Sequence, residues 1–133
     1  MSVTTLMTTD INGDELVMFA QQTATTLVGN NLTRSQIRGI FTEVRKIEAM
    51  WDGHLTEAMR RLNMLKPKLD YQTARSPSVK VLRDVLTQAI DEVNKAQKDE
   101  NHTQDEDRTR RFRVFMDLFE AILAYHRSQG GRS

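Results

Sequence analysis

Basic side chains are the residues of this sequence whose type and spacing indicate chemistry with a partner. From Arg34 to Arg83 the chain has eleven Lys or Arg and five Asp or Glu, whereas the segment that follows is slightly acidic. Lys and Arg neutralise phosphate groups, so a basic middle in a chain of net charge +1 indicates an anionic partner, although a solvated basic face gives the same pattern. The candidate contacts are Arg38, Arg45, Lys46, Lys66, Lys68 and Arg75.

Tyr71 lies among the basic residues that surround Pro67. A basic loop beside an aromatic ring is a surface that an RNA backbone and one stacked base could use. A tyrosine in such a position is more often a core residue whose hydroxyl reaches the rim, and we expect that arrangement for Tyr71.

Residues for catalysis, metal binding or cofactor binding are not grouped in a recognisable motif. The three histidines are far apart, and the chain has no cysteine and no glycine-rich phosphate-binding loop. His126 falls on an apolar helical face, which predicts a core or edge histidine rather than a metal ligand. Acidic residues at 105–107 could hold a divalent cation, but in the first turn of a helix they more often complement the helix dipole. We therefore expect no catalytic residues, no metal and no cofactor.

Hydrophobic periodicity predicts an all-α fold, a compact bundle of five to six helices in one domain over residues 1–133. Thr33 and Gln36 form a capping-box pattern, which predicts that a helix starts there. Pro67 predicts a break, because proline lacks the N–H group that a helix interior needs. The expected helices are 14–27, 33–51, 55–65, 69–75, 77–95 and 105–128.

Two segments lack a pattern that would tie them to the core. Residues 1–13 are predicted to be a flexible tail, and residues 96–104, which are polar and aperiodic, a mobile loop. The first ten residues do not have the pattern of a signal peptide, and no apolar run approaches the roughly 18 residues of a membrane span. We expect a cytoplasmic protein that does not bind membranes.

Three segments, taken in order, resemble the motifs of one protein family. The first is LTRSQIR at 32–38, which is similar to LTTSQIR in that family. The second is LKPKLDYQTAR at 65–75, which is similar to a family segment that ends in YQAGR. The third comprises RF at 111–112, FEAILAY at 119–125 and GG at 130–131. The family is the small subunit of the type III-A CRISPR effector, the Csm complex.

The resemblance implies a small helical bundle that is not itself a nuclease. Such subunits stack head to tail in several copies and line the groove that holds guide RNA paired with target RNA. They contact the backbone subunit that cuts target RNA and the large polymerase-like subunit, and an isolated copy could instead form a dimer. Arg38 and Arg75 match the arginines of the first two motifs, which implies that they contact RNA. The other RNA-binding residues are predicted from charge placement alone: Arg45, Lys46, Lys66 and Lys68.

Three alternatives remain open at the level of the sequence. A structural bundle that binds a protein partner without touching nucleic acid is compatible with the seven methionines and the apolar stripes. A helix-turn-helix DNA regulator would use residues 34–46 as its recognition helix, but the tight turn that this motif needs is missing. A small enzyme would require a bound metal or a measured activity.

Overall fold

The chain forms six α-helices and one 3₁₀ turn over the residues that the structure describes. This computed structural model describes residues 2–10 and 12–132, so predictions that fall on residues 1, 11 and 133 lie outside it. Within the described part there is no β-strand, which confirms the predicted all-α bundle. In chain order the elements are α1 (Val3–Thr8), α2 (Asp14–Gly29), α3 (Arg34–Trp51), α4 (Leu55–Arg75), η1 (Pro77–Val79), α5 (Lys80–Asn94) and α6 (Gln104–Ser128).

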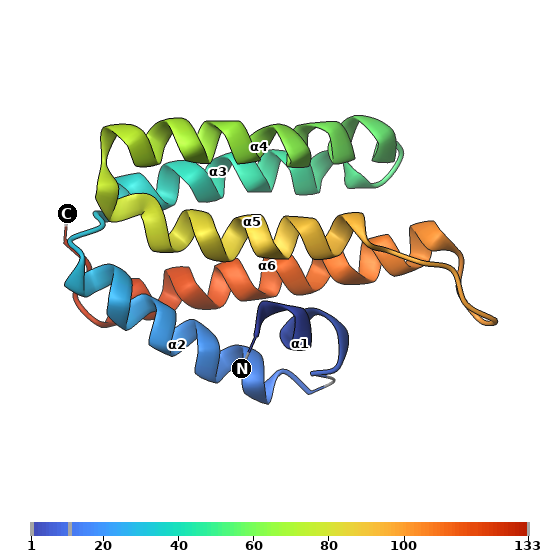
Figure 1. Cartoon of the computed structure of the whole chain (residues 1–133), viewed down its shortest axis with the longest axis horizontal. Coiled ribbons are helices and arrows are strands. Elements are labelled where there is room, and N and C mark those ends of the chain that lie inside the picture. Colours follow the sequence, from blue (N-terminus) through green and yellow to red (C-terminus); the bar gives the residue numbers. More distant parts are fainter. Residues whose placement is uncertain (1, 11, 133) are drawn as a thin grey trace.

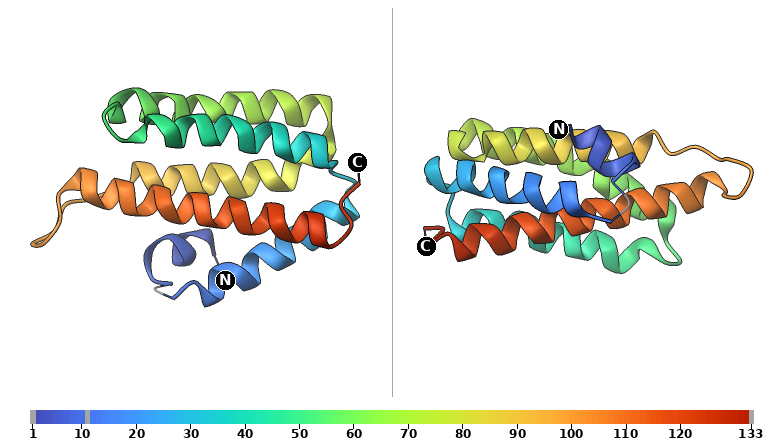
Figure 2. Two further views of the ribbon diagram at one scale, coloured as in Figure 1. Left: turned by 180° about the vertical axis from the view of Figure 1, so that it is seen from behind. Right: turned by 90° about the horizontal axis from the view of Figure 1, so that it is seen from below.

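The helices pack in three layers (Figure 1). Helices α3 and α4 are antiparallel neighbours in one outer layer, α5 and α6 form the middle layer, and α1 and α2 cover its opposite face. Helix α6 contacts α1, α2, α3 and α5, so it lies at the centre of the bundle. The end of the chain lies beside the start of α3 (Figure 2), where the backbone N–H of Arg34 donates to the carbonyl of Arg132 at 2.6 Å.

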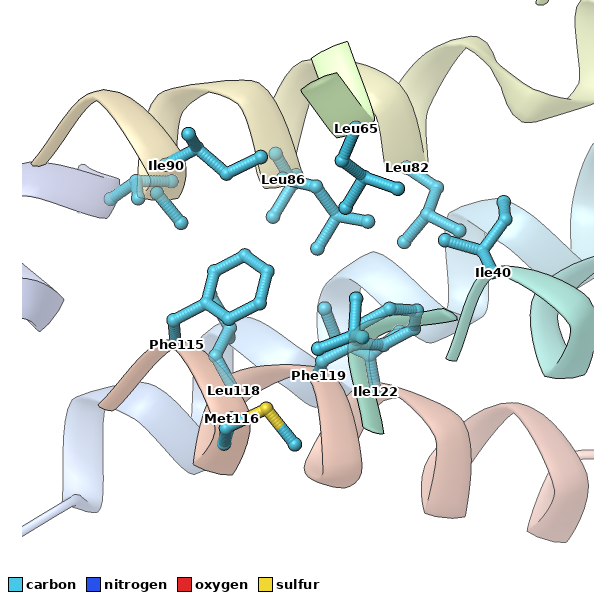
Figure 3. Close-up of a cluster of buried hydrophobic side chains, with 14 of the residues drawn as sticks. Ile40, Leu65, Leu82, Leu86, Ile90, Phe115, Met116, Leu118, Phe119 and Ile122 are labelled. Carbon is cyan, nitrogen blue, oxygen red and sulfur yellow. The ribbon is translucent and has the colours of Figure 1, made fainter. Parts of the chain in front are cut away.

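The main core lies where α6 faces the helices of the other layers (Figure 3). Phe115 and Phe119 of α6 point toward Leu86 of α5, with Leu65 of α4 and Ile40 of α3 beside them. All five side chains are buried. Phe112, Phe115, Phe119 and Ile122 recur every three or four positions, which keeps these four side chains on one face of α6. Burial of each such side chain stabilises the fold by about 1.5–3 kcal/mol.

Residues 3–8, which fall in the segment 1–13 that was predicted to be a flexible tail, form helix α1. The side-chain hydroxyl of Thr4 also donates to the carboxylate of Glu92 on α5 at 3.1 Å. The physical reason for the difference is a short apolar stripe at helical spacing, which outweighs the run of threonines. The buried residues of this stripe are Val3, Leu6 and Met7.

Helix α4 runs through Pro67 without a break, so the predicted break and the two shorter helices on either side of it are wrong. Leu62, Leu65 and Leu69 are buried on one face of α4. Their combined burial, at about 1.5–3 kcal/mol each, offsets the roughly 3 kcal/mol or more that a proline costs inside a helix. Pro67 itself is exposed, so its ring displaces no core side chain.

Residues 95–103 connect α5 to α6 without helix or strand, and the mobility predicted for residues 96–104 stays a prediction. Asp107 in the first turn of α6 holds this connection, since its carboxylate accepts the backbone N–H of Gln97 at 3.0 Å. Arg110 and Arg111 also donate to this carboxylate, at 2.7 and 3.0 Å. Burial opposes ionisation of Asp107, but the Gln97 N–H and the two guanidinium groups outweigh it and lower the pKa of the carboxyl.

The two glycines near the end of the chain are used differently. Gly130 has a positive φ of 84°, which ends α6 with a turn that suits glycine. Gly131 packs against the buried ring of His126, so closely that a Cβ atom would lie 2.2 Å from ring atom Cε1. The His126 ring cannot retreat, because it is fully buried and its Nε2 donates to the carbonyl of Leu32 at 2.8 Å. The prediction of a core or edge histidine is therefore confirmed.

Replacement of Gly131 by alanine should destabilise the protein, because the new methyl group would overlap the His126 ring. We expect a loss of about 1–3 kcal/mol in the free energy of unfolding, measured by urea denaturation followed by circular dichroism. Gly39→Ala is the matched control, since a Cβ there meets no atom within 4 Å and the site is inside α3. It should stabilise the protein by about 0.5–1 kcal/mol. Equal stability of Gly131→Ala and wild type would contradict the packing described.

The Asp107→Asn variant should be destabilised by about 1–2 kcal/mol at neutral pH, because it loses charge-assisted hydrogen bonds. The pKa of Asp107 is lower in the folded than in the unfolded chain, so its carboxylate stabilises the fold above the ordinary value of 3.8. This stability is lost as the pH falls below 3.8 and through the folded-state pKa. The difference between variant and wild type in urea denaturation should therefore shrink at acidic pH. Asp117→Asn, at an exposed position, serves as control and should show little difference at any pH.

Candidate nucleic-acid interface

The six predicted contact residues lie on α3 and α4, the antiparallel pair of the outer layer. Two hydrogen bonds set how the helices align: Gln36 Nε2 donates to Ser76 Oγ at 2.9 Å, and Lys68 Nζ donates to Glu43 Oε1 at 3.2 Å. The start of α3 therefore lies beside the end of α4. This alignment brings Arg38 and the last turn of α4 to the same end of the bundle.

Glu43 neutralises two of the predicted residues. Its carboxylate lies 3.9 Å from Lys46 Nζ on α3 and 3.2 Å from Lys68 Nζ on α4. The two lysine side chains are more than half exposed, so each ion pair contributes at most about 1 kcal/mol. A phosphate that approached either lysine would also approach the negative charge of Glu43.

Arg45 and Lys66 are engaged with helices of the middle layer. Arg45 Nη1 lies 3.1 Å from Glu48 on its own helix and 3.3 Å from Glu120 on α6. Lys66 forms an ion pair with Asp91 on α5. Arg45 and Lys66 thus pair with carboxylates of two different helices of the middle layer. The structure does not bring them together with the other four candidate residues.

Arg38 and Arg75 differ from the other four candidates. Both side chains are exposed, and neither has an acidic partner within 4.0 Å among the residues that the structure describes. Arg75 Nη1 donates to the hydroxyl of Tyr71 at 3.3 Å, and its guanidinium carbon lies 5.7 Å from the centre of the Tyr71 ring. Two cationic groups whose charge is not neutralised by the protein are therefore exposed near one end of the α3–α4 pair.

Tyr71 is 62% exposed, so the expectation that it is a core residue is wrong. The reason lies in the continuity of α4. At about 100° per residue, Tyr71 is roughly 200° from Leu69 around the helix and so points away from the buried face. If the helix broke at Pro67, the rotation of Tyr71 about the helix axis would not be fixed relative to the buried leucines. The predicted break therefore led to the wrong expectation for Tyr71.

A groove of about 820 Å³ lies between α3 and α4 at this end. We call it the α3–α4 groove, and its walls include Gly39, Met64, Lys68, Tyr71 and Arg75. Gly39 contributes no side chain and keeps the α3 wall low. Arg38 lies next to Gly39 on α3, beside the groove rather than among the residues that line it.

Three further cations were not among the RNA contacts predicted from the sequence. Lys80 begins α5, Arg127 is in the last turn of α6, and Arg132 follows it. None of them has an acidic partner within 4.0 Å in the described part of the chain. The beginning of α5 and the end of α6 lie at the same end of the bundle as the start of α3 (Figure 1). Only the packing of helices distant in sequence could have grouped these residues with Arg38 and Arg75.

The described residues contain neither a metal-binding cluster nor a membrane-spanning helix. No cluster of three or more histidine and carboxylate side chains is arranged to hold a metal ion there. None of the helices found in residues 2–10 and 12–132 combines the length and the apolar character needed to cross a lipid bilayer.

The fold and this surface define a small all-α protein that exposes arginines from a helical hairpin. Residues 10–132 match the family model Csm2 Type III-A. The chain belongs to this family and is a small subunit of the type III-A CRISPR effector, which confirms the resemblance seen in the sequence. Comparisons with curated proteins and with solved structures found no significant match.

Replacement of Gln36 by alanine should weaken the end of the hairpin that carries both arginines. Gln36 completes the capping box of α3 by accepting the Thr33 N–H at 2.9 Å, and it also donates to Ser76. We expect a loss of about 1–2 kcal/mol in urea denaturation. Gln88→Ala on the exposed face of α5 should change the stability by less than about 0.5 kcal/mol. Equal losses in the two variants would show that Gln36 has no special role.

Proposed function

We propose that this subunit binds and stabilises the duplex of guide RNA and target RNA without catalysing a reaction, in the cytoplasm. Arg38 and Arg75 are the principal contacts. One observation supports this choice above others: of six candidates, these two are exposed without an acidic partner among the described residues. They are also the two that match the arginines of the family motifs. A cation that is already paired with a carboxylate gains less binding free energy from a phosphate than an unpaired cation does.

The recognition chemistry is electrostatic. A guanidinium group donates two hydrogen bonds to a phosphate and releases counterions from the RNA, which gives affinity independent of base sequence. Contacts to 2′-hydroxyl groups would add a preference for RNA. Base pairing with the guide supplies sequence recognition, so the protein does not need to read base edges.

Assembly strengthens this weak contact. We propose that several copies stack head to tail and contact the backbone subunit and the large polymerase-like subunit of the Csm complex. Each copy adds its own arginines along one duplex, so the copies bind with a high effective concentration. In isolation the same surfaces would allow a dimer.

The Arg38→Ala/Arg75→Ala double variant tests the proposed contacts. Binding of the full-length chain to an RNA duplex is measured by fluorescence anisotropy at several salt concentrations. The slope of log affinity against log salt should fall by roughly one for each lost contact. The matched control is Arg45→Ala/Lys46→Ala, which removes the same charge from ion-paired residues and should lower the slope much less.

An equal effect of both double variants would contradict a specific role for Arg38 and Arg75, since only overall charge would then matter. If wild-type affinity is too low, the same variants are tested in the reconstituted effector. An effector that holds its RNA equally well with the wild-type and the Arg38→Ala/Arg75→Ala subunit would favour a structural role without RNA contact. Preference for duplex DNA of defined sequence would instead favour a DNA regulator.

A further inference from the structure

The α3–α4 groove combines an apolar surface with cationic groups. Met64 is 52% exposed and Tyr71 62%, an unusual exposure for large apolar side chains, and both line the groove. Lys68 and Arg75 lie along the same walls, and the Arg75 guanidinium carbon is 5.7 Å from the centre of the Tyr71 ring. Phosphate binding alone requires the cations but gives no reason for an exposed aromatic ring.

We infer that the α3–α4 groove holds the base of one unpaired nucleotide of the bound RNA, stacked on the ring of Tyr71. This inference rests on the proposed RNA-binding function and adds to it a site for a base. The adjacent cations Arg75 and Arg38 hold the phosphates on either side of that nucleotide. A paired base cannot reach the ring, because its faces are covered by its neighbours in the duplex.

The chemistry of the groove favours a nucleotide over an apolar protein segment. Every nucleobase has a flat π-face that stacks on an aromatic ring, and a guanidinium beside the ring adds a cation–π contribution. A nucleotide also brings the negative charge that complements Arg75, which has no acidic partner within 4.0 Å among the described residues. The amide of Gln72 and the hydroxyl of Ser35 line the groove as well, so the base edge meets groups that donate and accept hydrogen bonds. Such adaptable groups tolerate any of the four bases.

A second exposed apolar surface provides a comparison. Val17 and Met18 on α2 are 43% and 48% exposed, but α2 contains no basic residue. That surface lacks the charge that would attract a phosphate. Met18→Ala is therefore a matched control for the loss of an exposed apolar side chain away from the groove.

The test uses the full-length chain and an RNA duplex that carries one unpaired 2-aminopurine, a base whose fluorescence is quenched by stacking. Wild-type protein should quench this fluorescence, and Tyr71→Phe, which keeps the ring, should quench it equally. Tyr71→Ala should abolish the quenching and bind this RNA at least about fivefold more weakly, as expected for one lost base–aromatic stack. Its affinity for the fully paired duplex depends on Tyr71 only through the orientation of Arg75, so it should fall less than its affinity for the RNA with the unpaired base, and its circular dichroism spectrum should be unchanged. Met18→Ala should behave as wild type.

Three results would overturn the inference in distinguishable ways. If Tyr71→Ala binds and quenches like wild type while Arg38→Ala/Arg75→Ala still flattens the salt dependence, the RNA contact stands and the base site does not exist. If Tyr71→Ala binds both RNAs normally but is lost from the reconstituted effector, the groove holds a protein partner. If wild type binds neither RNA, alone or in the effector, the proposed function and the base site fail together.

Discussion

The continuous apolar stripe of α4 is the constraint on which the surface depends. Leu62, Leu65 and Leu69 are buried against the bundle, so the rotation of α4 about its axis is fixed along its whole length. Once that rotation is fixed, Tyr71 and Arg75 must face outward, because they lie on the opposite side of the helix. A helix that ended at Pro67 would leave the last turns free to rotate and would not define the α3–α4 groove.

Ion pairing divides the basic middle of the chain into two kinds of residue. Glu43, Asp91 and Glu120 approach four of the cations that the charge pattern singled out, and these pairs connect α3 and α4 with each other and with the middle layer. Exposed pairs of this kind stabilise a fold little, but they reduce the local positive potential. The net charge of +1 therefore coexists with a small region of uncompensated positive charge around Arg38 and Arg75.

Local sequence patterns correctly predicted the features that depend on contacts between residues close together in the sequence. The capping box of Thr33 and Gln36 forms as predicted, because its two hydrogen bonds connect residues three positions apart. The all-α bundle follows from apolar periodicity. Helix α1, the passage of α4 through Pro67 and the exposure of Tyr71 were not predicted, since each depends on burial against helices distant in the sequence. The pairing of Arg45 with Glu120 is likewise invisible to any local pattern.

The same non-local contacts explain why charge placement overestimated the number of candidate contacts. An ion-paired lysine that turns to a phosphate leaves its carboxylate behind, and that carboxylate then repels the RNA across a few ångströms. Glu43 would act in this way on an RNA strand near Lys46. Arg38 has no acidic neighbour among the described residues, and Arg75 is oriented by a neutral tyrosine, so neither would leave an opposing charge at the surface. Tyr71 thus holds a guanidinium in place without neutralising it, which a carboxylate could not do.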